Sequence, residues 1–373
     1  MQHNMTDSTT KSILRFILRC IAVISPVIIS LLIWYIYVDP FKVIHHYDSY
    51  FPDPDAEPAR IGLNKGMVTI TNLDDRMKEG QRYNAFIFGS SISCYYETDD
   101  WCVLLDSLAM HDRLPKSGDT SKPYGPGSQP VRPYHFDSSA ETLISMAKKV
   151  RYLDRKGVDI DYALVILDPI VMTTDPGESP AYLDPPQLQA NPVDLLHYHY
   201  TFFRAATNAD FLKSYLPSKF ENQPIENGRN LVFEPQPIVY DPLNNQERLP
   251  SWDSVISTDP GSFYQQYPLL PSPDRLTSAD KGIGDKEKRA LTEIAGIFSR
   301  HDTDFRVIIG PNRRKVALNP ADLTELKGIF GEGKVFDYST SMVTLFETDT
   351  LLYDNLHYRA PAARLLMERT YSN

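Results

Sequence analysis

The chain has 373 residues, of which 42% are hydrophobic, so it can bury a sizeable core in one large domain or two ordinary ones. Its formal net charge of −10 argues against a nucleic-acid partner, because binding to a phosphate backbone requires a basic surface.

The first predicted element is a membrane span. Residues 20–38 carry no charged side chain, and at about 1.5 Å per residue they nearly match a hydrocarbon core of about 30 Å. Lys11, Arg15 and Arg19 precede this stretch, so the positive-inside tendency places residues 1–19 in the cytoplasm. We therefore expect a single-pass protein of the bacterial inner (cytoplasmic) membrane, with its N-terminus inside and the rest periplasmic.

Two other interpretations of the apolar stretch stay open, a cleaved signal peptide and a buried helix of a soluble protein. The stretch ends in an aromatic run, Trp34 to Val38, which is typical of a membrane interface. A cleaved signal would have a shorter apolar region and a site with small residues. An uncleaved anchor is the favoured interpretation.

After the anchor, residues 39–79 are predicted to form a stalk or linker, and residues 80–373 a single α/β domain. Short apolar runs alternate there with helical stretches, the pattern of a three-layer, doubly wound parallel sheet. The predicted strands are 83–88, 131–136, 162–167, 305–309 and 335–338. The predicted helices are 142–153, opened by a capping box at 138–141, together with 285–298, 320–330 and 360–371.

A long segment, about 175–275, interrupts this alternation. It is rich in Pro and Tyr and contains one predicted helix near 195–215. Loops of this length in compact domains are usually functional or carry their own structure. We interpret the segment as an insertion near the carboxyl ends of the strands, where ligands bind in open α/β sheets. It either shapes a substrate cleft or forms a structural flap.

The cysteines give an open question. Cys20 lies in the apolar stretch, whereas Cys94 and Cys102 either pair in an oxidising compartment or remain separate buried thiols. The spacing fits no zinc pattern, and no metal or cofactor is expected.

Two motifs carry the chemistry. The first predicted strand ends in Gly89-Ser90-Ser91, and Asp354 precedes His357 by three residues just before the last predicted helix. A serine hydroxyl becomes a nucleophile when a histidine takes its proton, and the histidine needs an acceptor on its other ring nitrogen. The sequence therefore predicts a catalytic triad of Ser91, His357 and Asp354.

These two motifs resemble block I and the last block of the GDSL/SGNH hydrolase superfamily, block I in its Gly-Ser-Ser form. The resemblance implies an SGNH or flavodoxin-like sheet with Ser91 as nucleophile. A competing α/β-hydrolase would show Gly-x-Ser-x-Gly, but Ser93 stands where the second glycine would be.

The family's Gly and Asn oxyanion donors are not evident here. A backbone N–H of Ser91, or one near Ser138 or Ser139, is the candidate replacement, whereas an anionic Asp168 cannot donate. His135 and Asp168 are interpreted as structural polar groups. Asn312 is either a substrate contact or a turn residue.

The expected function is a membrane-anchored, extracytoplasmic serine esterase or acyltransferase. The resemblance and the location imply O-acyl esters, such as O-acetyl groups on cell-envelope carbohydrate, or small esters as substrates. The alternative is a non-catalytic envelope assembly factor that retains the fold.

Overall fold

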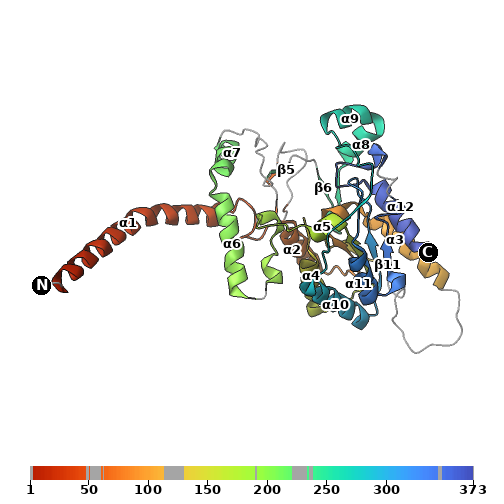
Figure 1. The fold of residues 1–373 in the computed structure, drawn as a ribbon, viewed down its shortest axis with the longest axis horizontal. Helices are drawn as coiled ribbons and strands as arrows, with labels where there is room; N and C mark the ends of the chain where they lie inside the picture. Colours follow the sequence, from red (N-terminus) through yellow and green to blue (C-terminus); the bar gives the residue numbers. More distant parts are fainter. Residues whose placement is uncertain are drawn as a thin grey trace.

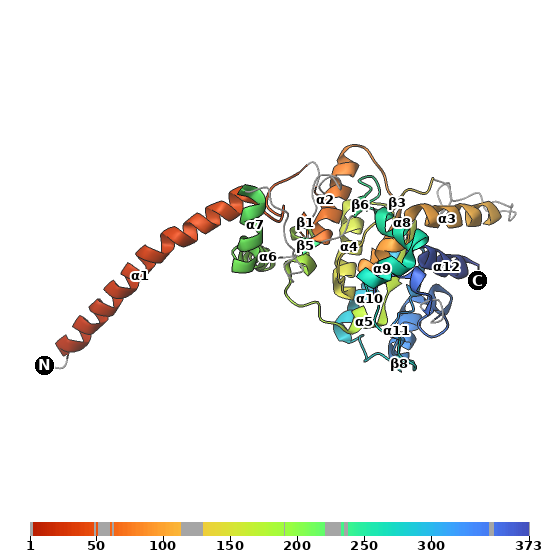
Figure 2. The same cartoon turned by 90° about the horizontal axis from the view of Figure 1, so that it is seen from above.

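A computed structural model describes residues 3–47, 50, 60–61, 63–112, 130–189, 191–220, 233–234, 238–342 and 347–372. Within this part of the chain, one helix is long and apolar enough to cross a membrane. It is α1 (His3–Val38), with an apolar stretch Ser12–Val38 whose most apolar window is not buried by the rest of the protein, whereas Tyr35 near its end is buried. Figures 1 and 2 show α1 projecting away from the body of the molecule.

The body is built on a five-stranded parallel sheet in the order β3–β2–β4–β9–β11. Counted along the chain, this is the order 2-1-3-4-5 of doubly wound folds, whose switch point lies between the first and third strands. The strands are β2 (Ala85–Gly89), β3 (Pro133–His135), β4 (Tyr162–Leu167), β9 (Asp304–Ile309) and β11 (Val335–Asp337). All five agree with the predicted runs to within two residues at each end.

Helices cover both faces of the sheet, because successive side chains of the buried strands point to opposite faces. Phe86 and Phe88 of β2 pack in a core with α2, α4, α10 and α11, whereas Ala85 and Ile87 pack with α3 and α12. These helices are α2 (Lys65–Lys78), α3 (Thr98–Asp112), α4 (Leu143–Lys156), α10 (Asp285–Arg300), α11 (Pro320–Phe330) and α12 (Ala360–Tyr371).

Two details of the sequence interpretation change. Helix α2 falls in the predicted stalk, but its Ile70 and Leu73 are fully buried in the same core as β2, so the folded body begins before residue 80. The capping box at 138–141 is wrong. Thr142 caps α4 by accepting from the N–H of Ser145, and Ala140, inside the predicted box, has a left-handed backbone with φ of 49°.

The long segment after β4 carries its own elements. Near 195–215 there are two helices instead of one, α6 (Pro192–Ala206) and α7 (Ala209–Phe220). Its described residues also form α5 (Pro169–Thr173), α8 (Pro250–Thr258), α9 (Pro260–Gln266), two 3-10 helices, Pro180–Tyr182 and Pro186–Leu188, and four strand pieces. Two of these pieces pair with strands outside the segment, β1 (Arg60–Ile61) and β10 (Val316–Ala317). The pieces are β5 (Phe233–Glu234), β6 (Val239–Tyr240), β7 (Glu247–Arg248) and β8 (Thr277–Ser278), which form the pairs β1–β5, β6–β7 and β8–β10.

Candidate active site

Ser91 stands at the carboxyl end of β2, as the first residue of a short 3-10 helix, Ser91–Tyr95. Gly89 makes the turn from strand to helix possible. Its φ is +155°, and a Cβ there would lie 2.8 Å from the carbonyl oxygen of Ile166 and 2.8 Å from Cβ of Ser93. The strand can therefore end abruptly and present Ser91 only because residue 89 has no side chain.

Asp354 and His357 share one tight loop just before α12. The Oδ1 atom of Asp354 accepts hydrogen bonds from the backbone N–H groups of Leu356 and His357, both at 2.7 Å. An isolated bridge between Leu352 and Tyr358 closes the loop. These contacts fix the position of the aspartate carboxylate beside the imidazole.

Helix α8 of the long segment holds this loop in place. Its Asp253 accepts from the hydroxyl of Tyr353 at 2.8 Å and from Nε of Arg359 at 2.7 Å. Tyr353 and Arg359 lie on either side of the aspartate–histidine pair, so the segment supports the loop at both ends.

The three predicted triad residues meet in space. His357 Nε2 lies 2.8 Å from Oγ of Ser91, and His357 Nδ1 lies 2.8 Å from Oδ2 of Asp354. Burial opposes ionisation of Asp354, but its hydrogen bonds and the neighbouring imidazole outweigh burial and hold its pKa below the ordinary value. An ionised carboxylate on one ring nitrogen and a hydroxyl on the other is the arrangement in which imidazole can accept the serine proton.

A cavity of about 270 Å³ opens at the triad. Its walls come from α2, from the 3-10 helix, from the loop that holds His357 and from the long segment. Ser139 also lines it, so one of the two predicted serines reaches the site. The lining residues are Leu63, Lys65, Ser91, Cys94, Tyr95, Ser139, Ile238, Glu247, Leu249, Trp252, Tyr353, Asp354 and His357.

The other two candidate binding residues lie elsewhere. Ser138 donates its backbone N–H to the carbonyl oxygen of Gly89 at 3.2 Å, so it supports the turn below the nucleophile. Asn312 pairs with the backbone of Val316, donating to its carbonyl at 2.8 Å and accepting from its N–H at 3.1 Å. Asn312 therefore closes a turn, and it is not among the residues that line the triad cavity.

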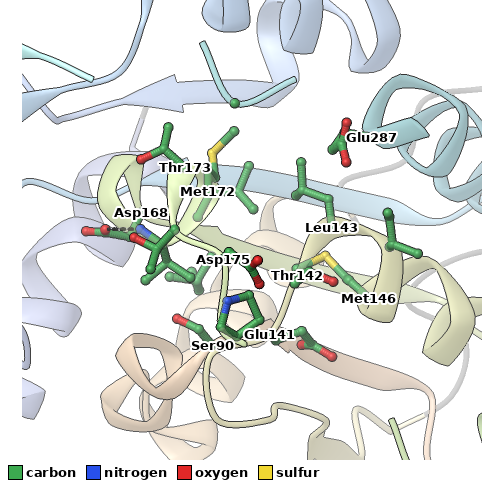
Figure 3. A pocket seen from close by; sticks show the side chains of 17 residues that line it. Ser90, Glu141, Thr142, Leu143, Met146, Asp168, Met172, Thr173, Asp175 and Glu287 are labelled. Atoms are coloured by element: carbon green, nitrogen blue, oxygen red, sulfur yellow. Dashed lines mark hydrogen bonds between the residues drawn. The ribbon is translucent and has the colours of Figure 1, made fainter. Parts of the chain in front are cut away.

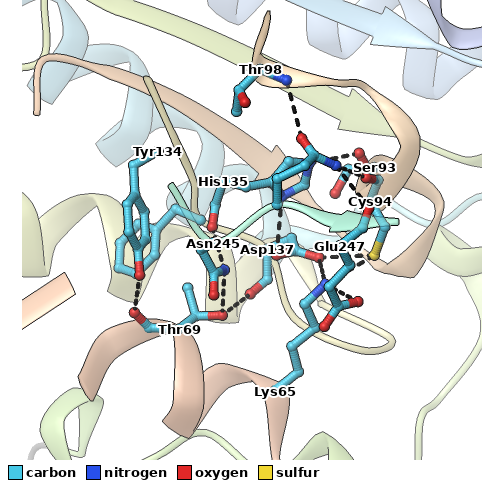
Figure 4. Close-up of polar contacts among 12 residues, drawn as sticks. Lys65, Thr69, Ser93, Cys94, Thr98, Tyr134, His135, Asp137, Asn245 and Glu247 are labelled. Carbon is cyan, nitrogen blue, oxygen red and sulfur yellow. Dashed lines mark hydrogen bonds and ion pairs between the residues drawn. The ribbon is translucent and has the colours of Figure 1, made fainter. Parts of the chain in front are cut away.

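Figure 4 shows a buried polar cluster, which we call the Lys65 cluster, and three of its residues, Lys65, Cys94 and Glu247, also line the triad cavity. Lys65 forms an ion pair with Asp137, contacts Glu247 at 2.9 Å and contacts Sγ of Cys94 at 3.0 Å. Nδ1 of His135 lies 3.0 Å from the second oxygen of Asp137. The side chains of Asp137 and His135 are 0% and 1% exposed, so these charges and dipoles are compensated by one another and not by water.

The electrostatics of the cluster follow from this burial. Burial opposes charge on both Lys65 and Asp137, but their mutual attraction outweighs it, so the pKa of Lys65 is raised and that of Asp137 is lowered. Burial raises the pKa of Cys94, which stays a thiol. Both Cys94 and Cys102 are free.

The cluster also fixes the 3-10 helix that carries Ser91. Nε2 of His135 lies 2.8 Å from the carbonyl oxygen of Ser93, and the side chain of Gln246 donates to the carbonyl oxygen of Cys94 at 2.6 Å. Sequence reasoning missed Lys65, Glu247 and Gln246, because nothing in their local pattern indicates that residues so far apart in the chain meet.

A second cavity, of about 300 Å³, lies at the switch point between β2 and β4 (Figure 3). Ser90, Asp168 and Glu141 are among its lining residues. Asp168 caps α5, accepting from the N–H groups of Ile170 and Val171 at 2.8 and 3.0 Å. Burial raises the pKa of Asp168 to about 6 and that of Glu141 to about 7, although Lys149 lies 2.8 Å from Glu141.

Among the described residues, no group of three or more His, Cys, Asp or Glu side chains is arranged to hold a metal ion. Comparison with protein-family models finds no match for this chain, and comparison with curated proteins finds none either. Function is therefore inferred from the geometry of the site.

Proposed function

We propose that this protein is a membrane-anchored, extracytoplasmic serine esterase or acyltransferase of the SGNH type, acting on O-acyl esters of cell-envelope carbohydrate. The observation that carries the proposal is the unbroken chain from Ser91 through His357 to Asp354, with both contacts at 2.8 Å. The strand order of the sheet and the place of Ser91 at the end of its first strand support the same class.

In the proposed reaction, Oγ of Ser91 attacks the acyl carbonyl while Nε2 of His357 takes the hydroxyl proton. Asp354 orients the imidazole and stabilises the imidazolium that forms. His357 then returns the proton to the leaving alcohol, and an acyl-serine remains. Water or a sugar hydroxyl, deprotonated by the same imidazole, attacks this ester and releases Ser91.

The oxyanion of the intermediate needs N–H donors. Ser91 is the first residue of its 3-10 helix, and the first N–H groups of a helix have no partner within it. This N–H belongs to the residue that carries the nucleophile, and Ser139 lines the same cavity. We assign the oxyanion site to these two residues.

The cavity walls support a substrate with both apolar and hydroxyl surfaces. Tyr95, Trp252 and Tyr353 bring aromatic rings to the cavity, and Glu247 brings a carboxylate. Ring faces can cover the apolar side of a sugar, and a carboxylate accepts hydrogen bonds from hydroxyl groups. A volume of about 270 Å³ suits a short acyl group together with part of its carrier.

The test is active-site labelling of the full chain with a fluorophosphonate probe, followed by location of the adduct. We expect the adduct on Ser91 and its loss in Ser91→Ala. Ser91→Ala or His357→Ala should reduce ester turnover by up to roughly a millionfold, because triad members act as a unit. Ser90→Ala is the matched control, since its hydroxyl makes no capping hydrogen bond and is assigned no proton transfer.

The outcomes separate the candidate functions. Near-normal turnover in Ser91→Ala together with loss in Ser90→Ala would show that the nucleophile is misassigned. A protein that the probe does not label, and that shows no turnover of O-acyl esters above background with or without either substitution, would be a non-catalytic envelope assembly factor. For the anchor, protease added to spheroplasts should degrade the chain beyond residue 39, and protection of that part would contradict the orientation.

A further inference from the structure

Helix α6 exposes a row of large apolar side chains outside the catalytic body. Val193 is 73% exposed, Leu196 71% and Tyr200 55%. They recur at the spacing of one helix face, and Phe203 continues the same row. On the opposite face Tyr198 and Phe202 are fully covered, whereas Leu195 is 40% exposed.

The end of this row packs against the last turns of α1. The rings of Phe203 and Tyr35 lie 5.7 Å apart in an edge-to-face arrangement, and the rings of Tyr215 on α7 and Trp34 lie 6.2 Å apart. Trp34 and Tyr35 belong to the apolar stretch Ser12–Val38 itself. The α6–α7 hairpin therefore sits beside the outer end of the span and not beyond it.

The direction of α6 relative to α1 matters for what can cover the row. Figure 1 shows α6 running crosswise to α1, at the point where α1 meets the rest of the molecule. If α1 crosses a bilayer, a crosswise helix at the level of Tyr35 lies along the bilayer surface. Phe203 contacts Tyr35 near the end of α1, and Leu196 and Tyr200 lie on the same face of α6 as Phe203.

We infer that α6 is an interfacial helix that inserts Val193, Leu196 and Tyr200 into the outer boundary of the bilayer that α1 spans. The inference rests on the proposed anchor, and its partner is a lipid surface. Tyrosine beside aliphatic side chains is the composition of such helices, and the exposed Arg204 at the edge of the row suits the headgroup layer. Two attachments, α1 and α6, would fix how the triad cavity faces the membrane, which a single flexible anchor cannot do.

The test uses the full chain in nanodiscs of phosphatidylcholine and phosphatidylglycerol. Cys20 and Cys102 are replaced by Ala, whereas Cys94 is kept because it is buried. An environment-sensitive fluorophore is then attached at one new cysteine, Leu196→Cys, Tyr37→Cys or Leu365→Cys. Tyr37 reports on the anchor, and Leu365, 40% exposed on α12, is the control away from α1.

Lipids that carry a nitroxide on the upper acyl chain should quench the labels at positions 196 and 37 to a similar extent, and the label at position 365 at least twofold less. Quenching at 37 but not at 196 would overturn the interfacial helix and leave the anchor standing. Quenching at neither position would remove the anchor and the inference together. A label at 196 that is shielded from water but not quenched by lipid would show that a protein surface, such as a second copy, covers α6, and would also overturn the inference.

Discussion

Replacing Lys65 by methionine tests the cluster that supports the nucleophile. The substitution keeps most of the length of the side chain and removes its charge. It leaves Asp137, whose side chain is 0% exposed, and Glu247, whose side chain is 12% exposed, without their shared cation. Solvent cannot replace that cation at Asp137.

The size of the effect follows from burial. At an effective dielectric constant of about 20, two unit charges 2.9 Å apart attract by about 6 kcal/mol, and the cost of desolvating the lysine offsets part of this. Breaking a buried pair by removing one partner typically costs about 3–5 kcal/mol. We expect Lys65→Met to lower the free energy of unfolding by about 4 kcal/mol and the melting temperature by on the order of 10 °C.

Urea denaturation of the full chain in detergent, followed by tryptophan fluorescence, measures this loss. Lys78→Met is the matched control, because Lys78 lies on the same helix and pairs with Asp75 but its side chain is 74% exposed. Solvent screens such an exposed pair, so Lys78→Met should change the free energy of unfolding far less than Lys65→Met. Lys65→Met combined with Asp137→Asn should recover part of the stability, since the stranded charge is then removed.

The pH dependence distinguishes charge from packing. Asp137 has a lowered pKa in the folded protein, so its stabilisation is present above its unfolded value of about 3.9 and is lost as pH falls below it. In Lys65→Met the pKa of the buried carboxyl group should rise, and protonation on acidification should then relieve the penalty. A loss of less than about 1 kcal/mol, or one equally large at pH 5 and pH 8, would refute the electrostatic account.

The sheet could be predicted from the sequence because its central strands are buried on both faces. Such strands appear as continuous apolar runs, and Tyr162–Leu167 was predicted with its observed bounds. Helix α2 was missed because it is rich in polar and charged residues and only one side of it, with Ile70 and Leu73, faces the core. The start of α4 was predicted to within one residue, but its N-cap is Thr142 and not the capping box at 138–141.

Only the site residues that belong to short sequence motifs could be predicted. Ser91 follows a strand, and Asp354 and His357 share a loop, so short motifs identify all three. Lys65 and Glu247 contact each other beside the triad although they are 182 residues apart in the chain. Their contact depends on how the long segment packs against the rest of the domain. A single sequence carries no signal for such a pairing.

Three further substitutions probe the site and its support. Gly89→Ala should lower the free energy of unfolding by about 2–4 kcal/mol in urea, because its Cβ would lie 2.8 Å from the carbonyl oxygen of Ile166 at a φ of +155°; an unchanged midpoint would contradict this. Asp354→Asn should lower kcat about 10⁴-fold with little change in the free energy of unfolding. A large loss of folding stability along with the loss of kcat would point to misfolding.

Asp168→Asn tests the raised carboxyl pKa at the switch point. Burial raises the pKa of folded Asp168 to about 6, so the folded protein holds this proton more tightly than the unfolded chain, and the ionised group destabilises the fold above that pH. Asparagine keeps the oxygen that caps α5 and cannot ionise. The free energy of unfolding of the variant should therefore exceed that of the wild type by up to about 3 kcal/mol at pH 8. Near pH 4 the two should be equal, because the carboxyl group of Asp168 is then protonated in the folded protein and no longer destabilises it. A gain of the same size at both pH values would show that packing, and not ionisation, separates the two side chains.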